Sequence, residues 1–126
     1  METFKDDVFM VYETMHECLP QFNKINRDAT RKILLESDLI HTTLGAASSK
    51  DDMALKLKCT NLTLEIWYLY PTIVSTNSDA ILGLGTMSLR ESFHNILVAG
   101  TKERDKIFKI NVFAMAFTLL DRLAEK

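Results

Sequence analysis

Apolar residues recur every three or four positions along most of this chain, which is the spacing of one face of an α-helix. The first such run covers residues 4–19, and Pro20 is expected to end it because proline cannot continue the helical hydrogen-bond ladder. The β-branched run 72–74 is too short to build a sheet alone. The pattern therefore predicts an all-α fold.

Two long helices are expected, over about residues 50–70 and 102–124. Pro71 should end the first, and the Thr-, Ser- and Asn-rich stretch 71–77 is typical of a loop. Gly100 stands where a helix end favours a left-handed residue, so it should end a shorter helix before residue 102. The apolar stripes of the long helices should form the core. The residues expected to be nearly fully buried are Leu57, Trp67, Ile110 and Phe117.

The two halves of the chain resemble each other at an offset of 53 residues. The identities at this offset pair His41 with His94, Leu44 with Leu97, Ala46 with Ala99, Asp52 with Asp105, and Lys56 with Lys109. The shared unit is a short helix, a tight polar turn and a longer, apolar-rich helix. Such a unit cannot bury its own apolar face and needs a neighbour, as the units of a solenoid protein do.

The segments 37–57 and 88–123 resemble armadillo or HEAT repeats, which consist of a short apolar helix, a small polar turn and a long apolar helix. The resemblance implies a right-handed stack of about five to seven helices. The length of 126 residues fits a single helical domain over 1–126, and the resemblance implies repeat-like units at about 28–70 and 78–125. A compact helical bundle is the alternative architecture.

Armadillo repeats carry two further features that this chain matches poorly. One is a glycine before the short helix, where Asp38 stands here. The other is an asparagine late in the long helix that grips an extended peptide, whereas Asn61 is out of register with that position. The resemblance therefore supports the fold more than a peptide-gripping groove.

Composition narrows the range of functions. The chain has 126 residues, 47% hydrophobic and 25% charged, and its four Gly and two Pro favour long helices. A net charge of −2 gives no basic surplus for nucleic acid, and no stretch approaches the roughly 18 apolar residues of a membrane span. Cys18 and Cys59 lack metal-ligand spacing, and two cysteines make a weak case for a disulfide framework. We therefore expect an intracellular protein of the cytoplasm or nucleus, where thiols stay reduced.

No catalytic, cofactor-binding or metal site is expected from the motifs. His41 and His94 occupy equivalent repeat positions, but a zinc site needs further ligands and none lies at ligand spacing. The acidic pairs 6–7 and 51–52 lie at predicted helix starts, where negative charge stabilises the helix dipole.

An aromatic cluster and a basic cluster suggest contact with a partner. Tyr68 and Tyr70 lie near the end of a predicted helix and away from its buried stripe, and Tyr is a common interface anchor. Lys102, Lys106 and Lys109 open the last predicted helix, where they could steer an acidic partner.

These features favour a non-enzymatic protein–protein interaction module, complete or a fragment of a larger scaffold protein. Its partner would be a protein, either an acidic segment or a helical one. A two-unit stack leaves its end faces partly apolar, which allows homodimerisation or origin in a longer chain. The alternative is a small helical-bundle adaptor or viral-type effector that binds a host protein. An enzyme whose site residues are scattered along the sequence is the least favoured reading.

Overall fold

The computed structural model describes residues 2–36, 39–47, 53–82, 87–102 and 105–124. Helices account for 97% of these residues and no strand occurs among them, which confirms the predicted all-α class. The helices in this part of the chain are α1 (Glu2–Ile25), α2 (Arg27–Glu36), α3 (Leu39–Ala47), α4 (Met53–Leu69), α5 (Pro71–Leu82), α6 (Met87–Lys102) and α7 (Lys106–Ala124). Asp38 and Asp52 lie outside the described residues, as does the side chain of His41.

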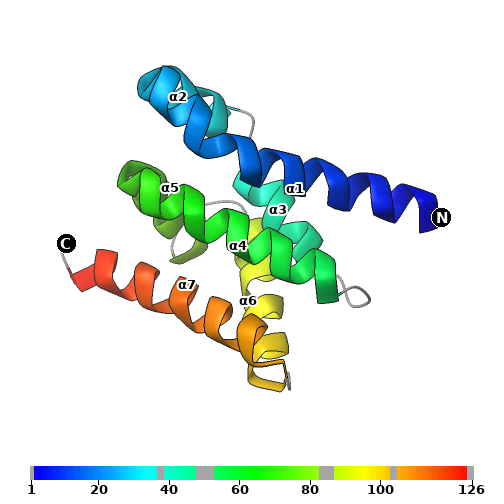
Figure 1. The fold of residues 1–126 in the computed structure, drawn as a ribbon. Coiled ribbons are helices and arrows are strands. Elements are labelled where there is room, and N and C mark those ends of the chain that lie inside the picture. Colours follow the sequence, from blue (N-terminus) through cyan, green and yellow to red (C-terminus); the bar gives the residue numbers. More distant parts are fainter. Residues whose placement is uncertain (1, 37–38, 48–52, 83–86, 103–104, 125–126) are drawn as a thin grey trace.

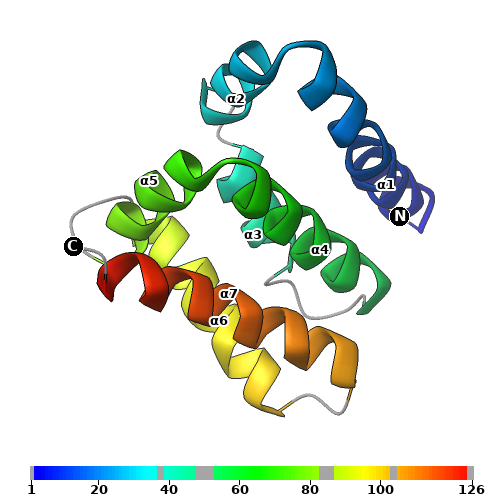
Figure 2. The same cartoon turned by 60° about the vertical axis from the view of Figure 1, so that its left-hand side comes forward.

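The long helices α1, α4 and α7 lie side by side in one layer, with α4 in the middle (Figure 1). Behind this layer, α3 packs on α4 and α6 packs on α7, and α3 and α6 also contact each other (Figure 2). Helix α2 packs on α1, while α5 packs against α6 and α7. The middle position of α4 makes it the helix around which the others assemble.

The core is centred on α4, which α1, α3 and α7 cover from different sides. This covering buries polar side chains of α4 as well as apolar ones. Thr60 and Thr63 are fully buried, and each hydroxyl donates a hydrogen bond to the backbone carbonyl four residues earlier, both at 2.9 Å. Their polar groups are therefore satisfied inside the core. Large fully buried side chains include Leu44, Leu62, Ile66, Tyr70, Ile96, Phe108 and Met115.

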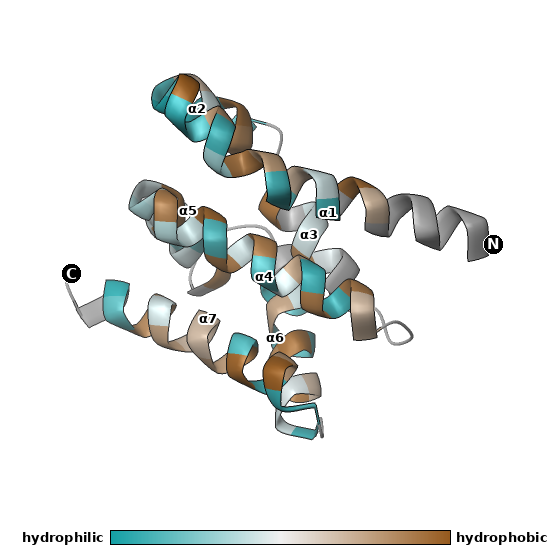
Figure 3. Ribbon diagram, in the orientation of Figure 1, coloured by the Kyte–Doolittle hydropathy of each residue, from teal (hydrophilic) through white to brown (hydrophobic). Residues whose placement is uncertain are grey.

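Of the four residues expected to be nearly fully buried, Trp67 is, at 2% exposed, whereas Leu57 is only partly buried and packs against the core. The prediction was wrong for Ile110 and Phe117, which are 65% and 67% exposed. Helix α7 carries apolar residues on two faces, and Figure 3 shows apolar colouring on successive turns. The face that enters the core comprises Phe108, Val112, Met115 and Leu119. Both faces have helical spacing, so periodicity alone cannot choose between them.

The first helix does not end at Pro20, as expected, but continues to Ile25. A proline inside a helix costs about 3 kcal/mol, because it removes a hydrogen bond and crowds the preceding turn. Packing on both sides of the proline offsets this cost. Leu19 is buried, and Asn23 accepts a hydrogen bond from the Tyr70 hydroxyl at 2.6 Å.

The stretch 71–77 is not the expected loop but the first part of α5. Pro71 is the first residue of that helix, where a backbone N–H would have no helical partner and proline is well tolerated. The carbonyl of Tyr70 accepts the N–H of Ile73 at 2.9 Å, and both Ile73 and Val74 are buried. Burial of these apolar residues outweighs the loop-like composition around them.

The last helix begins at Lys106, because the carboxylate of Asp105 caps it by accepting the Phe108 N–H at 3.0 Å. Gly100 does not end a helix but lies within α6. A Cβ atom at this position would lie 2.7 Å from Cγ1 of Val112. Glycine therefore allows α6 to approach α7 closely.

Candidate functional site

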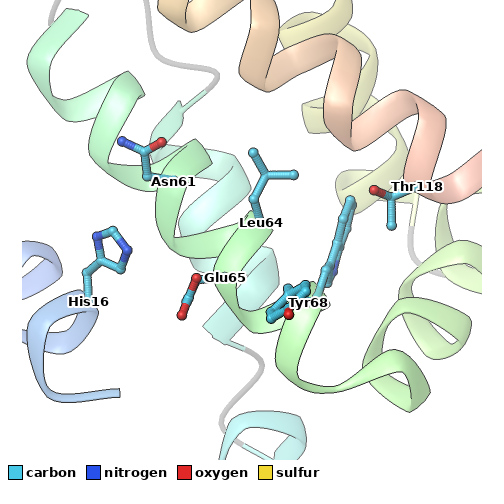
Figure 4. Close-up of a pocket in the computed structure, with 7 residues that line it drawn as sticks. His16, Asn61, Leu64, Glu65, Tyr68 and Thr118 are labelled. Carbon is cyan, nitrogen blue, oxygen red and sulfur yellow. The ribbon is translucent and has the colours of Figure 1, made fainter. Parts of the chain in front are cut away.

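A hollow of about 540 Å³ opens on the layer formed by α1, α4 and α7 (Figure 4). Helix α4 provides most of its lining, with one residue from each neighbouring helix. The lining residues are His16 of α1, then Asn61, Leu64, Glu65, Trp67 and Tyr68 of α4, and Thr118 of α7. Asn61, Leu64 and Tyr68 are three and four residues apart, which places them on one face of α4.

Asn61 is held by a polar cluster between α4 and α7. The side-chain Nδ2 of Asn111 donates to Oδ1 of Asn61 at 2.9 Å and to Oγ1 of Thr60 at 3.0 Å. These bonds engage the oxygen of the Asn61 amide, and Figure 4 shows its nitrogen on the side that faces His16. The Asn61 amide therefore presents a fixed N–H donor to the hollow, and such a donor suits a carbonyl oxygen.

Tyr68 is 81% exposed at the edge of the hollow. Its neighbours divide between two sides of α4: Figure 4 shows Glu65 and His16 towards α1, and Leu64 and Thr118 towards α7. Trp67 is buried beneath the hollow, and its Nε1 donates to Oδ1 of Asn77 at 2.8 Å. Because this bond engages the only polar group of the indole, Trp67 makes the floor of the hollow partly apolar. The hollow thus combines an exposed aromatic ring, apolar surface and a few polar groups.

Tyr70 lies in a different environment from the surface position expected for it. It is fully buried, and its hydroxyl donates to Asn23 of α1. The guanidinium of Arg27 lies 5.1 Å from the Tyr70 ring centre and donates to the Leu69 carbonyl at 2.7 Å. Burial raises the pKa of Tyr70, against a smaller lowering by the Arg27 charge. Tyr70 fixes α1 and α2 to the end of α4 and offers no surface to a partner.

The three candidate lysines lie where α6 ends and α7 begins. Lys102 and Lys106 are exposed and Lys109 is half-buried. Lys106 precedes Asn111 by five residues and Tyr68 follows Asn61 by seven, while Asn111 and Asn61 are hydrogen-bonded. At 1.5 Å per residue, Lys106 and Tyr68 are therefore separated by roughly 18 Å along the helices. The structure does not bring the basic and aromatic candidates together.

Sequence reasoning missed His16, Glu65 and Thr118 as lining residues. The spacing of Glu65 from Asn61 and Tyr68 on α4 is a usable signal, since residues three and four apart share a face. His16 and Thr118 lie about fifty residues away in sequence on either side. Only the packing of α1 and α7 on α4 brings them to the hollow.

Cys59 of α4 is fully buried, and burial raises the pKa of its thiol from 9.0 to about 12. We expect iodoacetamide at pH 8 to alkylate the half-buried Cys18 in the native chain and to spare Cys59 until denaturant is added. The native state keeps the Cys59 proton longer than the unfolded state does. This group should therefore lower stability as pH rises from about 9 to 12. Equal labelling of both thiols in the native chain, measured by mass spectrometry, would contradict this burial.

Within the described residues, no group of three or more His, Cys, Asp or Glu side chains is arranged to hold a metal ion. His94 is exposed on α6. Among the helices that the structure describes, none combines the length and apolarity needed to cross a bilayer. Comparison with protein-family models, with curated proteins and with solved structures finds no match to this chain.

Proposed function

We propose that this chain is a non-enzymatic protein-binding module whose α1–α4–α7 layer receives a segment of another protein. The observation that carries the proposal is the hollow around Asn61 and Tyr68. It joins a rigidly held amide donor, apolar surface from Leu64 and an aromatic ring that is 81% exposed. Exposed aromatic anchors beside apolar pockets and a few polar groups are typical of protein recognition sites.

The proposal includes an armadillo- or HEAT-like arrangement, with α2–α3–α4 and α5–α6–α7 as its two units. Burial supports this pairing, because buried residues recur at the offset of 53. The matching buried pairs are Ile40 with Phe93, Leu55 with Phe108, Cys59 with Val112, Leu62 with Met115, and Ile66 with Leu119. On this proposal the second unit starts at Pro71, earlier than the boundary at 78 that composition favours. Residues 38–67 should then superpose on residues 91–120.

The environment of Asn61 also bears on peptide binding. In the family that the sequence resembles, an asparagine of the long helix grips an extended peptide. Asn61 is out of register with that position, yet it lies on the face of α4 that lines the hollow, with its amide oxygen held by Asn111. We therefore propose that Asn61 donates to a backbone carbonyl of the bound segment.

The positions of Lys106 and Lys109 suggest that the bound segment also carries acidic side chains. A segment that reaches from the hollow to Lys106 would run along α4 and α7 for roughly 18 Å, or five to six extended residues at about 3.3 Å each. Acidic side chains at that distance from the anchoring residue would meet Lys106 and Lys109. Their main effect would be on the association rate and its salt dependence.

The proposal can be tested with peptides selected from a random display library on the native chain. Tyr68→Ala should weaken the selected peptides by about 2 kcal/mol, roughly thirtyfold in Kd by calorimetry, because it removes the proposed aromatic anchor. Phe22→Ala is the matched control, since Phe22 is also an exposed aromatic residue, at 57%, and does not line the hollow.

A second matched pair tests the polar contact. Asn61→Ala should also weaken binding, whereas Asn95→Ala on the exposed surface of α6 should leave it unchanged. Circular dichroism of each variant checks that the fold is intact. Failure to enrich any peptide would sink the proposal, and so would equal losses in the variants and their controls.

A further inference from the structure

Helix α7 exposes a second apolar face, which we call the α7 stripe: Ile110, Phe113, Phe117 and Leu120, exposed by 65%, 41%, 67% and 58%. At about 200 Å² per large apolar side chain, these exposures amount to roughly 450 Å². A patch of this size is as large as the largest on a typical monomer, and such patches are often functional. The stripe requires an explanation beyond ordinary surface composition.

The position of the stripe in the fold indicates what kind of surface it is. At the offset of 53, Phe113, Phe117 and Leu120 correspond to Thr60, Leu64 and Trp67 of α4. Thr60 faces α7, because it is bonded to Asn111, and Leu64 lies with Thr118 on the α7 side of the hollow (Figure 4). The stripe is therefore the equivalent of the surface on which α4 holds its neighbouring long helix, and it suits another helix.

The spacing along the stripe is symmetric about Met115. The four residues follow one another at intervals of three, four and three, and Met115 at the midpoint faces the core. The small residues Ala114 and Ala116 flank the midpoint, which allows close approach there. A two-fold interface needs such self-complementarity, because the same surface is used by both copies. An antiparallel pair places Ile110 level with Leu120 of the second copy and Phe113 level with Phe117.

Shape and charge agree with the antiparallel arrangement. A hollow of about 510 Å³, lined by Phe117, Thr118, Leu120 and Asp121, lies at the end of the stripe where Ile110 of the second copy would arrive. Lys109 and Asp121 lie six residues on either side of Met115. Antiparallel copies bring these opposite charges to the same level, whereas parallel copies would bring each charge level with its own kind.

We propose that the α7 stripe is a self-docking surface on which a second copy of this chain binds through its own α7, antiparallel and related by a two-fold axis. Two stripes together offer roughly 900 Å², and Ile107, 60% exposed, extends the patch. The total reaches the roughly 1,000 Å² expected of a specific interface. The comparison of the stripe with α4 rests on the repeat arrangement of the proposed function. The stripe itself is distinct from the face of α4 around Asn61 and Tyr68, so dimerisation and peptide binding are tested separately.

The test is the oligomeric state of the full chain by sedimentation equilibrium over a range of concentrations. The native chain should form dimers, and Ile110→Asp should raise the dimer Kd at least tenfold by placing a charge in the apolar interface. Ile33→Asp on α2 is the matched control, because Ile33 is 64% exposed and Ile110 is 65% exposed. The Ile33→Asp variant should dimerise as the native chain does. A native chain that stays monomeric, or a dimer that Ile110→Asp leaves intact, would overturn the proposal.

Cross-linking tests the orientation of the two copies, in a background where Cys18→Ser removes the more accessible thiol. In an antiparallel pair the two copies of position 114 lie near the two-fold axis, while those of position 120 are about 15 Å apart along the direction of the helices. A short bismaleimide should therefore link Ala114→Cys chains and not Leu120→Cys chains. A parallel pair would keep both positions level with their copies and would link Leu120→Cys chains as well, and no link in either variant would place the contact elsewhere. Both outcomes contradict the proposed interface.

Discussion

Phe108→Ala is expected to lower the free energy of unfolding by about 3–5 kcal/mol, the range for removing a large aromatic side chain from a core. Phe108 is fully buried on α7, and the Nζ of the buried Lys56 lies 5.9 Å from its ring centre. The substitution leaves a cavity between α4 and α7 and also removes a cation–π contact from a buried lysine. Urea denaturation followed by circular dichroism measures the loss.

Phe117→Ala is the control on the same helix. The sequence pattern places Phe117 in the core, but it is 67% exposed, so its truncation should cost less than about 1 kcal/mol in the monomer. The measurement belongs at concentrations where sedimentation shows a monomer, since a second copy would add stability. A larger loss for Phe117 than for Phe108 would mean that α7 is rotated relative to the structure.

Gly100→Ala should destabilise the chain by about 1–3 kcal/mol, the usual cost of overpacking. The new Cβ would lie 2.7 Å from Cγ1 and 2.9 Å from Cβ of Val112, and these atoms sit next to the α7 backbone and cannot move aside freely. Relief of the clash requires α6 and α7 to separate. The melting temperature and urea midpoint of the variant report the change.

Gly45→Ala should change the stability of the chain in the opposite direction. A Cβ on Gly45 meets no atom within 4 Å, and the residue lies inside helix α3. Alanine in a helix is favoured over glycine by about 0.5–1 kcal/mol, so the variant should be more stable than the native chain. If both glycine variants shift stability in the same direction, the close contact between α6 and α7 is not as described.

The helical class and the approximate positions of α4 and α7 follow from the sequence, but the evidence for α4 is mixed. From Leu55 to Cys59 apolar and polar residues alternate as in a strand, yet the segment is helical. Helices surround α4, so both its apolar residues and Thr60 and Thr63 are buried. Helix length and the apolar positions beyond this run are what distinguish it from a strand.

The two faces of α7 mark the limit of periodicity. Phe108 and Phe117 both belong to apolar stripes with helical spacing, and the choice between them depends on how α7 meets α4. The contact of Gly100 with Val112 and the hydrogen bond from Asn111 to Thr60 help to fix that orientation. Neither interaction can be read from local sequence, because its partners come from different helices.

The candidate site, too, could be predicted only in part from the sequence. Tyr68 could be selected from its place on α4, whereas the burial of Tyr70 depends on Asn23 and Arg27, more than forty residues earlier in the chain. Comparison with a repeat register leaves Asn61 out of the candidate site, although Asn61 lines the hollow. Its bond with Asn111 is a tertiary contact that the register does not contain.

An NMR titration of the isotopically labelled chain with a library-selected peptide tests whether the α1–α4–α7 face holds a protein segment. We expect the largest shifts at Asn61 and Tyr68, including the Asn61 side-chain amide, with smaller shifts at His16 and Thr118. The backbone signals of α6, which lies behind the layer and packs on α3, α5 and α7, should not move. Shifts confined to the α7 stripe or to α2, with Asn61 and Tyr68 unperturbed, would show that the peptide does not bind to this face.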